Sequence, residues 1–376
     1  MAGIYIHIPF CKQACTYCNF HFSTSLKQKS ELIHALNKEI LLSPAITAVP
    51  EQIDTIYFGG GTPSILSADE LKSILETLHR QFNINSHAEI TLEANPDDIS
   101  IPALDQWKKL GINRLSLGVQ SFFEAELKWM NRAHNATESL QSIDDIQEAG
   151  FTNFSVDLIY GSPFLSNDGL KKNLEMIFEK NIPHISCYAL TVEPKTALDK
   201  MIYQKKSLPV DPEKQAEQFL LLMDLMQQQQ YEHYEISNYS KPGMRSKHNS
   251  SYWSGEAYYG FGPSAHSFDG KKTRRWNIAN NSLYVQSLLK DIIPFEEEIL
   301  TETQQLNEYI MTSLRTIEGL DMEKISSVFG NNSYEKLKTR SQKYIDSKKI
   351  TLEAERLVLT REGKLFADGI AADLFF

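Results

Sequence analysis

Three cysteines within eight residues form the most reactive group of side chains in the sequence. Cys11, Cys15 and Cys18 stand in the segment Cys-Lys-Gln-Ala-Cys-Thr-Tyr-Cys, directly after an apolar run. Thiolates bind soft metals, and three of them leave one iron of a four-iron cluster open to a further ligand. A closed zinc site needs a fourth ligand, for which His7 or His21 is a candidate. The spacing favours the open iron–sulfur cluster, with zinc as the alternative.

A glycine run follows the second predicted strand, in the segment Tyr-Phe-Gly-Gly-Gly-Thr-Pro. Gly59, Gly60 and Gly61 carry no side chains, so their backbone amides and carbonyls can approach a bound ligand closely. Such runs also occur at simple turns, and the segment gains weight from the cysteines near it. The fourth cysteine, Cys187, stands in an apolar run and is expected to be a buried small hydrophobe.

The cysteine spacing Cys-x3-Cys-x2-Cys, with an aromatic residue before the last cysteine, and the later Gly-Gly-Gly-Thr-Pro segment resemble the radical S-adenosylmethionine (SAM) superfamily. In that superfamily a reduced 4Fe-4S cluster binds SAM and passes it an electron, which releases a 5′-deoxyadenosyl radical. Further similarity, from Tyr-x-His-Ile-Pro-Phe-Cys to the C-terminal part, is to the branch of the oxygen-independent coproporphyrinogen III oxidases.

The resemblance implies which side chains contact SAM. Glu93 of Leu-Glu-Ala-Asn-Pro would lie against it, and Arg132 and Asp157 match further contact positions. Arginine can hold a carboxylate bidentately, and an acidic side chain can accept ribose hydroxyls or an ammonium group. Taken singly, each could be a surface polar group or half of an ion pair. The implied set is Tyr5, Tyr17, Gly59, Gly60, Gly61, Thr62, Glu93, Gln120, Arg132, Asp157, Thr191 and His266.

A second motif points to heme. The segment Lys-His-Asn-Ser-Ser-Tyr-Trp matches the His-Asn-x-x-Tyr-Trp motif of the HemW family of heme chaperones, which the oxidases lack, and implies heme binding by His248, Asn249, Tyr252 and Trp253. Histidine can supply an axial nitrogen to heme iron, and aromatic rings can pack on the macrocycle. A lone histidine near aromatic residues is also commonly a hydrogen-bonded structural residue.

Two departures separate the sequence from the oxidases. Asn19 and Phe20 follow Cys18 where the oxidases carry a further cysteine, and Tyr5 stands almost at the start, where they have an additional segment. The first hypothesis is therefore a heme chaperone that delivers heme to acceptor hemoproteins and is expected to form a homodimer. The alternative is oxidative decarboxylation of coproporphyrinogen III, so the sequence leaves open whether the chain is an enzyme.

Alternating elements must position these residues. Short β-rich runs predict strands, and amphipathic runs between them predict helices. This rhythm predicts a partial (β/α)6 TIM-like barrel with reactive groups after the carboxyl ends of its strands. The predicted strands are Gly3–Ile8, Ile53–Phe58, Glu89–Glu93, Arg114–Val119, Phe154–Ile159 and Ile185–Leu190, and the helices are Ser30–Leu42, Ala68–Phe82, Ile101–Leu110, Thr137–Ala149, Gly169–Lys180 and Pro212–Gln229.

Three parts are expected along the chain: the barrel in 1–235, a connecting region with fading regularity and the heme motif in 236–295, and a mostly helical, winged-helix-like module in 296–376. In the module, the runs 350–352 and 357–360 predict a hairpin, and a short helix follows. Winged-helix modules can read DNA, but from Asp291 onward there are 16 acidic and 11 basic residues. A lid or docking role is therefore favoured.

Composition excludes several classes of function. The formal net charge of −10, from 48 acidic and 38 basic residues, provides no general attraction to nucleic acid or anionic lipid. No apolar run approaches the roughly 18 residues of a transmembrane helix, and the start resembles no cleaved leader. A cytoplasmic protein without a nucleic-acid substrate is expected.

Overall fold

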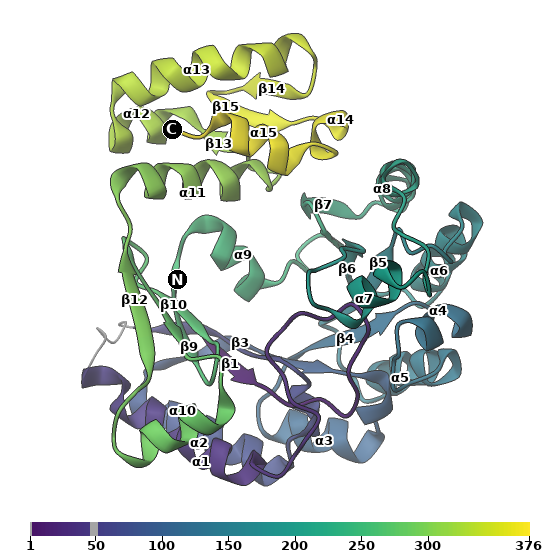
Figure 1. The fold of residues 1–376 in the computed structure, drawn as a ribbon, viewed down its shortest axis with the longest axis vertical. Coiled ribbons are helices and arrows are strands. Elements are labelled where there is room, and N and C mark those ends of the chain that lie inside the picture. Colours follow the sequence, from purple (N-terminus) through teal and green to yellow (C-terminus); the bar gives the residue numbers. More distant parts are fainter. Residues whose placement is uncertain (1, 46–51) are drawn as a thin grey trace.

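The computed structural model describes residues 2–45 and 52–376. Six parallel strands in sequential order, each followed by helical segments, form the partial barrel (Figure 1). Its strands are β1 (Ala2–Ile8), β2 (Ile53–Gly60), β3 (Ile84–Ala94), β4 (Arg114–Gln120), β5 (Phe154–Tyr160) and β6 (His184–Ala189). The predicted fold and its six strands are confirmed, with ends that differ by a few residues.

Helices cover the outer face of these strands. They are α1 (Lys29–Leu42), α2 (Ala68–Gln81), α3 (Ile101–Lys109), α5 (Ala136–Glu148), α6 (Asn167–Glu179) and α8 (Pro212–Gln228). Two short helices, α4 (Glu124–Trp129) and α7 (Ala197–Tyr203), lie outside the main apolar core. The six predicted helices are confirmed, while the short α4 and α7 were not predicted. Local signals explain the sharp starts: Ser67 and Glu70 form a capping box that satisfies free amides at the start of α2.

The strand period of two separates an apolar outer layer from a polar interior. In β1, Ile4, Ile6 and Ile8 are fully buried in the main apolar core beneath the helices. The alternate residues Tyr5 and His7 therefore face the inside of the barrel, since successive side chains of a strand point to opposite faces. The barrel thus holds its polar side chains inside, where a polar ligand can meet them.

Region 236–295 is more regular than expected. It contains β8 (Asn238–Ser240), α9 (Lys247–Ser254), β9 (Ala257–Phe261), β10 (His266–Phe268), β11 (Thr273–Asn277) and α10 (Asn281–Leu289). Strand β7 (Glu232–Glu235) precedes the region, and β12 (Phe295–Ile299) begins at its last residue. Strand β9 pairs in parallel with β1, so the same sheet continues into this region. The expectation of fading regularity is therefore wrong. The strands were missed in the sequence because three to five residues are too few to show a hydrophobic period.

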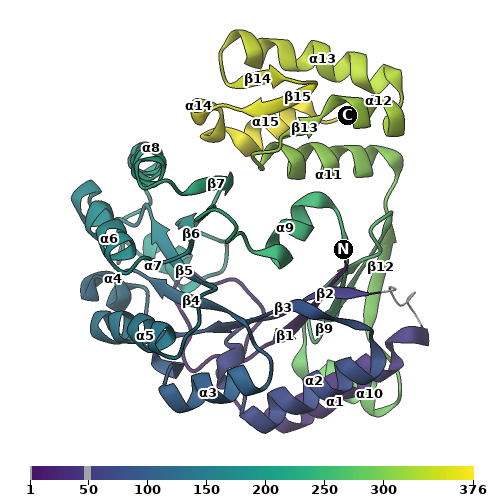
Figure 2. The same cartoon turned by 180° about the vertical axis from the view of Figure 1, so that it is seen from behind.

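A smaller module with its own apolar core follows (Figure 2). It comprises α11 (Glu302–Leu314), β13 (Leu320–Asp321), α12 (Met322–Phe329), α13 (Asn331–Asp346), β14 (Ile350–Glu353), β15 (Arg356–Leu359), α14 (Arg361–Lys364) and α15 (Ala367–Leu374). Strands β14 and β15 pair antiparallel, which confirms the predicted hairpin, and α15 is the predicted final helix. The boundaries at 235 and 295 stay predictions.

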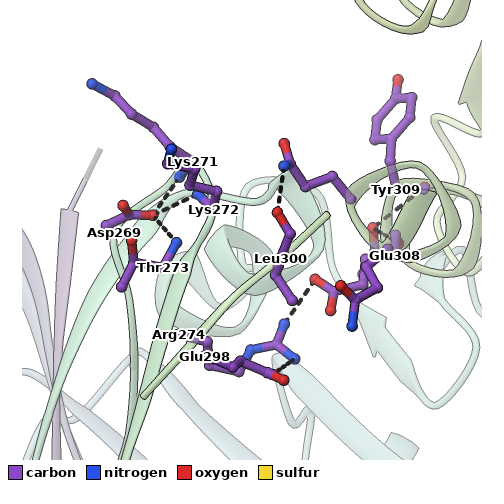
Figure 3. A network of polar contacts seen from close by, with 12 residues as sticks. Asp269, Lys271, Lys272, Thr273, Arg274, Glu298, Leu300, Glu308 and Tyr309 are labelled. Carbon is purple, nitrogen blue, oxygen red and sulfur yellow. Dashed lines mark hydrogen bonds and ion pairs between the residues drawn. The ribbon is translucent and has the colours of Figure 1, made fainter. Parts of the chain in front are cut away.

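Ion pairs join this module to the rest of the chain. Figure 3 shows Arg274 of β11 next to Glu308 of α11, at 2.7 Å, and next to Glu298 of β12, at 3.7 Å. On the other side of the module, Arg361 of α14 donates to Asp224 of α8 at 2.8 Å. Within the described ranges, no helix has the length and apolar character needed to cross a membrane.

Candidate metal centre and cofactor pocket

The three clustered cysteines lie on the loop after β1, at the carboxyl end of the barrel strands. All three line one pocket of about 430 Å³, in the size range of small-molecule sites. Among the described residues, no three His, Cys, Asp or Glu side chains are arranged as ligands of one metal ion. A 4Fe-4S cluster asks for a wider arrangement, since each cysteine binds a different iron.

The two histidines considered as zinc ligands make other contacts. The Nε2–H of His7 donates to the carbonyl of His21 at 3.0 Å, and its Nδ1 lies 3.2 Å from the Tyr5 hydroxyl. The Nε2 of His21 is 2.8 Å from Asn281 Oδ1. His7 therefore holds the segment that follows the last cysteine through Nε2, while its Nδ1 is bonded to Tyr5 within β1.

The segment after α4 holds the cysteine loop in place. Asn131 donates through Nδ2 to the carbonyl of Ala14 at 2.8 Å and accepts at Oδ1 from Gln13, also at 2.8 Å. Arg132 donates through Nη1 to the Cys15 sulfur at 3.2 Å. Its Nη2 donates to Asn95 Oδ1 at 2.6 Å. The guanidinium thus joins the cysteine loop to the loop after β3.

The pocket gathers most of the residues that the resemblance assigned to SAM. Besides the cysteines it is lined by Tyr17, Gly60, Gly61, Thr62, Glu93, Gln120, Arg132, Asp157 and Thr191. Gln120, at the end of β4, has a φ of 69°, which non-glycine residues rarely adopt outside functional sites and turns. Side chains from loops far apart in the sequence therefore meet at one mouth of the barrel.

Three residues of that set do not line the pocket. Gly59 lies just behind it: a Cβ there would stand 2.9 Å from the Tyr5 ring and 3.1 Å from Glu93 Oε1, so Tyr5 supports the glycine run from behind. His266 is exposed on β10, with its ring centroid 6.2 Å from that of Trp276. Contact of Tyr5, Gly59 and His266 with SAM stays a prediction.

Unpaired polar atoms show where the pocket would accept a ligand. Arg132 Nε and Asp157 Oδ1 are buried without a hydrogen-bond partner. Unpaired buried polar atoms are costly, and they are common where a ligand completes the hydrogen bonding. A donor and an acceptor presented together suit an amino acid with a carboxylate and an ammonium group, so the residues present fit SAM.

Burial shifts the acidities of the pocket groups. It raises the pKa of Glu93 to about 7 and that of Asp157 to about 6, because a carboxylate loses hydration there. A hydrogen bond from Tyr57, 2.7 Å from Glu93 Oε1, acts in the opposite direction. Burial also raises the pKa of the Cys11 thiol to about 11, so binding of a metal by this residue must displace a proton.

The residues assigned to heme lie at the other end of the barrel. His248 is fully buried on α9; its Nδ1 is hydrogen-bonded to Thr55 Oγ1 at 2.8 Å and its Nε2 to the Tyr252 hydroxyl at 2.9 Å. Trp253 is half-buried beneath the Arg315 guanidinium, 5.2 Å from its ring centre. Both ring nitrogens of His248 are occupied, so heme iron could reach one only after α9 moves.

Several residues that line the pocket were not predicted from the sequence. They are Gln13, Asn19, Phe20, Phe22, Ala94, Asn95, Ser116, Gly118, Ile159, Tyr188, Ala189, Leu190 and Glu193. A usable signal existed for part of them, because polar or small residues at alternate strand positions mark an inward face. Ser116 and Gly118 follow this spacing before Gln120 in β4, and Tyr188 follows Ser186 in β6.

A parallel partial barrel with three cysteines on its first loop, beside a polar pocket, defines the radical SAM class. The sequence model of the radical SAM superfamily matches residues 5–177, and that of the HemN C-terminal domain matches residues 300–366. The solved structure of coproporphyrinogen III oxidase (HemN) from Escherichia coli has a similar fold, with a TM-score of 0.86 at 23% identity over 100% of this chain and 90% of that one.

Sequence relatives give the particular family. The chain is 35% identical to the heme chaperone HemW of Bacillus subtilis (strain 168), over 98% of each sequence. It is 34% identical to the heme chaperone HemW of Lactococcus lactis, over 96% of this chain and 93% of the relative. The chain belongs to the HemW family of heme chaperones.

Proposed function

We propose that this chain binds heme and delivers it to acceptor hemoproteins, and that it carries a 4Fe-4S cluster on Cys11, Cys15 and Cys18. The observation that carries the proposal is similarity to heme chaperones along nearly the whole chain, which includes both the barrel and the C-terminal module. The absence of a further cysteine at Asn19 or Phe20 agrees with this function rather than with the oxidase.

The cysteine loop and the pocket supply the proposed cofactor site. The cluster would be held by the three thiolates, and SAM would take the open iron beside Glu93, Arg132 and Asp157. When bound, a reduced cluster supplies electron transfer to SAM. The chain's own part is positional: Arg132 supports the cysteine loop at Cys15 and presents a free Nε, and Asp157 presents a free Oδ1.

The heme site is proposed for the segment of α9 that contains His248, Asn249, Tyr252 and Trp253. Support comes from the motif; the geometry adds a condition, because His248 has no free ring nitrogen. Coordination by His248 would require α9 to leave its place against β1 and β2. Heme held by another part of the chain would leave α9 in place. A cytoplasmic location and a homodimer also remain proposals.

Heme titration tests the proposal directly. Heme is added to the reconstituted protein under anaerobic conditions, and the Soret band and the heme retained after gel filtration are measured. The proposal expects saturable binding; wild-type protein that retains no heme would overturn it. Comparison with His248→Ala then tests the ligand, since an unchanged Soret band would place heme elsewhere.

The alternative function is oxidative decarboxylation of coproporphyrinogen III. It is supported by one observation, the pocket beside the cysteines, which gathers nine of the residues that the resemblance assigned to SAM. The same reconstituted sample is incubated with reductant, SAM and coproporphyrinogen III. Formation of protoporphyrinogen would establish the enzyme, whereas heme binding without turnover would support the chaperone.

A further inference from the structure

The motif helix α9 closes the barrel at the end opposite to the cysteines. His248 lies against the early parts of three strands: its backbone N–H donates to Glu89 Oε1 of β3 at 3.1 Å, and its Nδ1 is bonded to Thr55 of β2. A Cβ on Gly3 of β1 would lie 3.2 Å from the imidazole. A side chain there would crowd the ring, so the glycine makes room for it.

From this position the imidazole contacts the cofactor pocket through one tyrosine. The ring of His248 stacks on that of Tyr57, with centroids 5.0 Å apart and planes inclined by 22°. The Tyr57 hydroxyl donates to Glu93 Oε1 at 2.7 Å, and Glu93 lines the pocket. Three side chains in direct contact thus run from the heme motif to the SAM pocket.

Each end of this chain of contacts is fixed. Thr55 and Tyr252 hold the two nitrogens of His248, and the ring of Tyr57 also packs against that of Tyr5, with centroids 6.1 Å apart. Packing against both rings holds Tyr57 with its hydroxyl directed toward Glu93. A side chain locked by packing and hydrogen bonds can hold a neighbouring group in its working geometry.

We infer that His248 is a positioning residue of the SAM pocket, which orients Tyr57 so that its hydroxyl supports the Glu93 carboxylate. This assignment rests on the proposed SAM site and is independent of heme binding. In this role His248 acts from its observed buried position, in which both ring nitrogens are hydrogen-bonded and neither is open to a metal.

The groups that face Glu93 determine how the role can be measured. They are Tyr5 of β1, Tyr57 and the Gly60 amide of β2, Asp157 of β5, Tyr188 of β6 and Tyr252 of α9. Tyr57 and the Gly60 amide favour the carboxylate by hydrogen bonds, and Asp157 opposes it by its charge. Loss of the Tyr57 hydrogen bond therefore raises the pKa of Glu93.

The test is SAM affinity as a function of pH, measured by equilibrium dialysis on the reconstituted protein. Wild type, Tyr57→Phe, His248→Ala and the double variant are compared, with Ser254→Ala at the exposed end of α9 as control. SAM affinity plotted against pH has a midpoint at which Glu93 is half ionised. Tyr57→Phe and His248→Ala are each expected to move this midpoint upward by about one pH unit. The double variant should move no further than Tyr57→Phe alone, because both changes act through one hydrogen bond.

The inference would be overturned if His248→Ala left the midpoint at the wild-type value. It would also be overturned if the shifts of His248→Ala and Tyr57→Phe added up in the double variant. Thr55→Val removes only the hydroxyl that holds Nδ1; if His248→Ala does not fold, the same midpoint criterion applies to this variant. Wild-type protein that binds no SAM would overturn the SAM assignment itself and this role with it. Heme binding lost in His248→Ala with an unchanged midpoint would favour a heme ligand instead.

Discussion

At the scale of single residues, the pocket combines groups that burial makes easy to protonate with groups that remain unpaired. Glu93 and Asp157 have raised pKa values, while Arg132 Nε and Asp157 Oδ1 lack partners. Such perturbed groups cluster at functional sites. Individual side chains can therefore be tested for cluster and cofactor binding separately.

Loss of one cysteine of the loop should abolish stable cluster binding. Cys18→Ala leaves two thiolates, so we expect the iron retained after anaerobic reconstitution and gel filtration to fall several-fold. Cys187→Ala is the matched control, because Cys187 is buried in β6 and does not line the pocket. Equal iron retention in wild type and Cys18→Ala would contradict the assignment.

SAM affinity should rise with pH across the neutral range. The pKa of Glu93 is raised to about 7, so the side chain is neutral below that pH and gains the charge that attracts the positive groups of SAM above it. Affinity measured from pH 6 to pH 8 should increase, with Asp157 acting in the same direction at its pKa of about 6. Glu93→Gln should bind SAM more weakly and lose most of this dependence; a Glu93→Gln profile parallel to that of wild type would argue against the role of Glu93.

At the scale of elements, the carboxyl ends of the strands and the loops after them place the site. The amide of Gly61, just after β2, donates to the carbonyl of Ile8 in β1 at 2.9 Å, which brings the glycine run under the cysteine loop. The approach is close: a Cβ on Gly61 would stand 2.5 Å from the Phe10 carbonyl oxygen. The absence of a side chain at this position is therefore a requirement of the fold around the cysteines.

Gly61→Ala should displace the cysteine loop. The added methyl would clash with backbone atoms, which cannot move aside by changing rotamer as a side chain can. We therefore expect about 1–3 kcal/mol of destabilisation and less iron retained on reconstitution. Thermal unfolding and iron content measure the two effects. Gly369→Ala is the control, since nothing lies within 4 Å of its added Cβ in α15 and alanine favours a helix. A Gly61→Ala protein as stable as wild type would show that the loop can yield.

The elements of the barrel were predictable because each has a clear period and clear ends. Capping residues such as Ser67 and long amphipathic runs identify helices, and the alternation around Tyr5 identifies a strand. The short strands of region 236–295 were missed since they have too few residues for a period. The burial of His248 was equally out of reach, because its partners Thr55 and Tyr57 lie almost 200 residues earlier and meet it only through the closure of the barrel.

At the scale of the whole molecule, the C-terminal module is attached to the barrel by ion pairs and by contacts around α9. Arg315 contributes to both, since it donates to the buried Glu235 at 3.1 Å and lies over the ring of Trp253. Figure 1 shows α9 between α11 and the barrel strands. A movement of α9 that frees His248 would thus also affect the module.

Arg274→Ala should loosen this attachment without unfolding either part. It removes the ion pair to Glu308 between half-exposed side chains, which is worth at most about 1 kcal/mol. Hydrogen exchange should become faster in α11 around Glu308 and in β12. Lys72→Ala, which breaks an exposed pair within α2, serves as the control and should leave α11 unchanged. Unchanged exchange in Arg274→Ala would mean that this pair does not secure the module.

The central claim is that the chain carries heme in order to pass it on. The most direct measurement mixes the heme-loaded, reconstituted protein with an apo-hemoprotein and follows the Soret band of the acceptor over time. The account predicts that heme leaves this protein and appears in the acceptor in equal amount, with no conversion of coproporphyrinogen III by the same sample. Heme that stays on this protein in the presence of excess acceptor, or a sample that forms protoporphyrinogen, would contradict it.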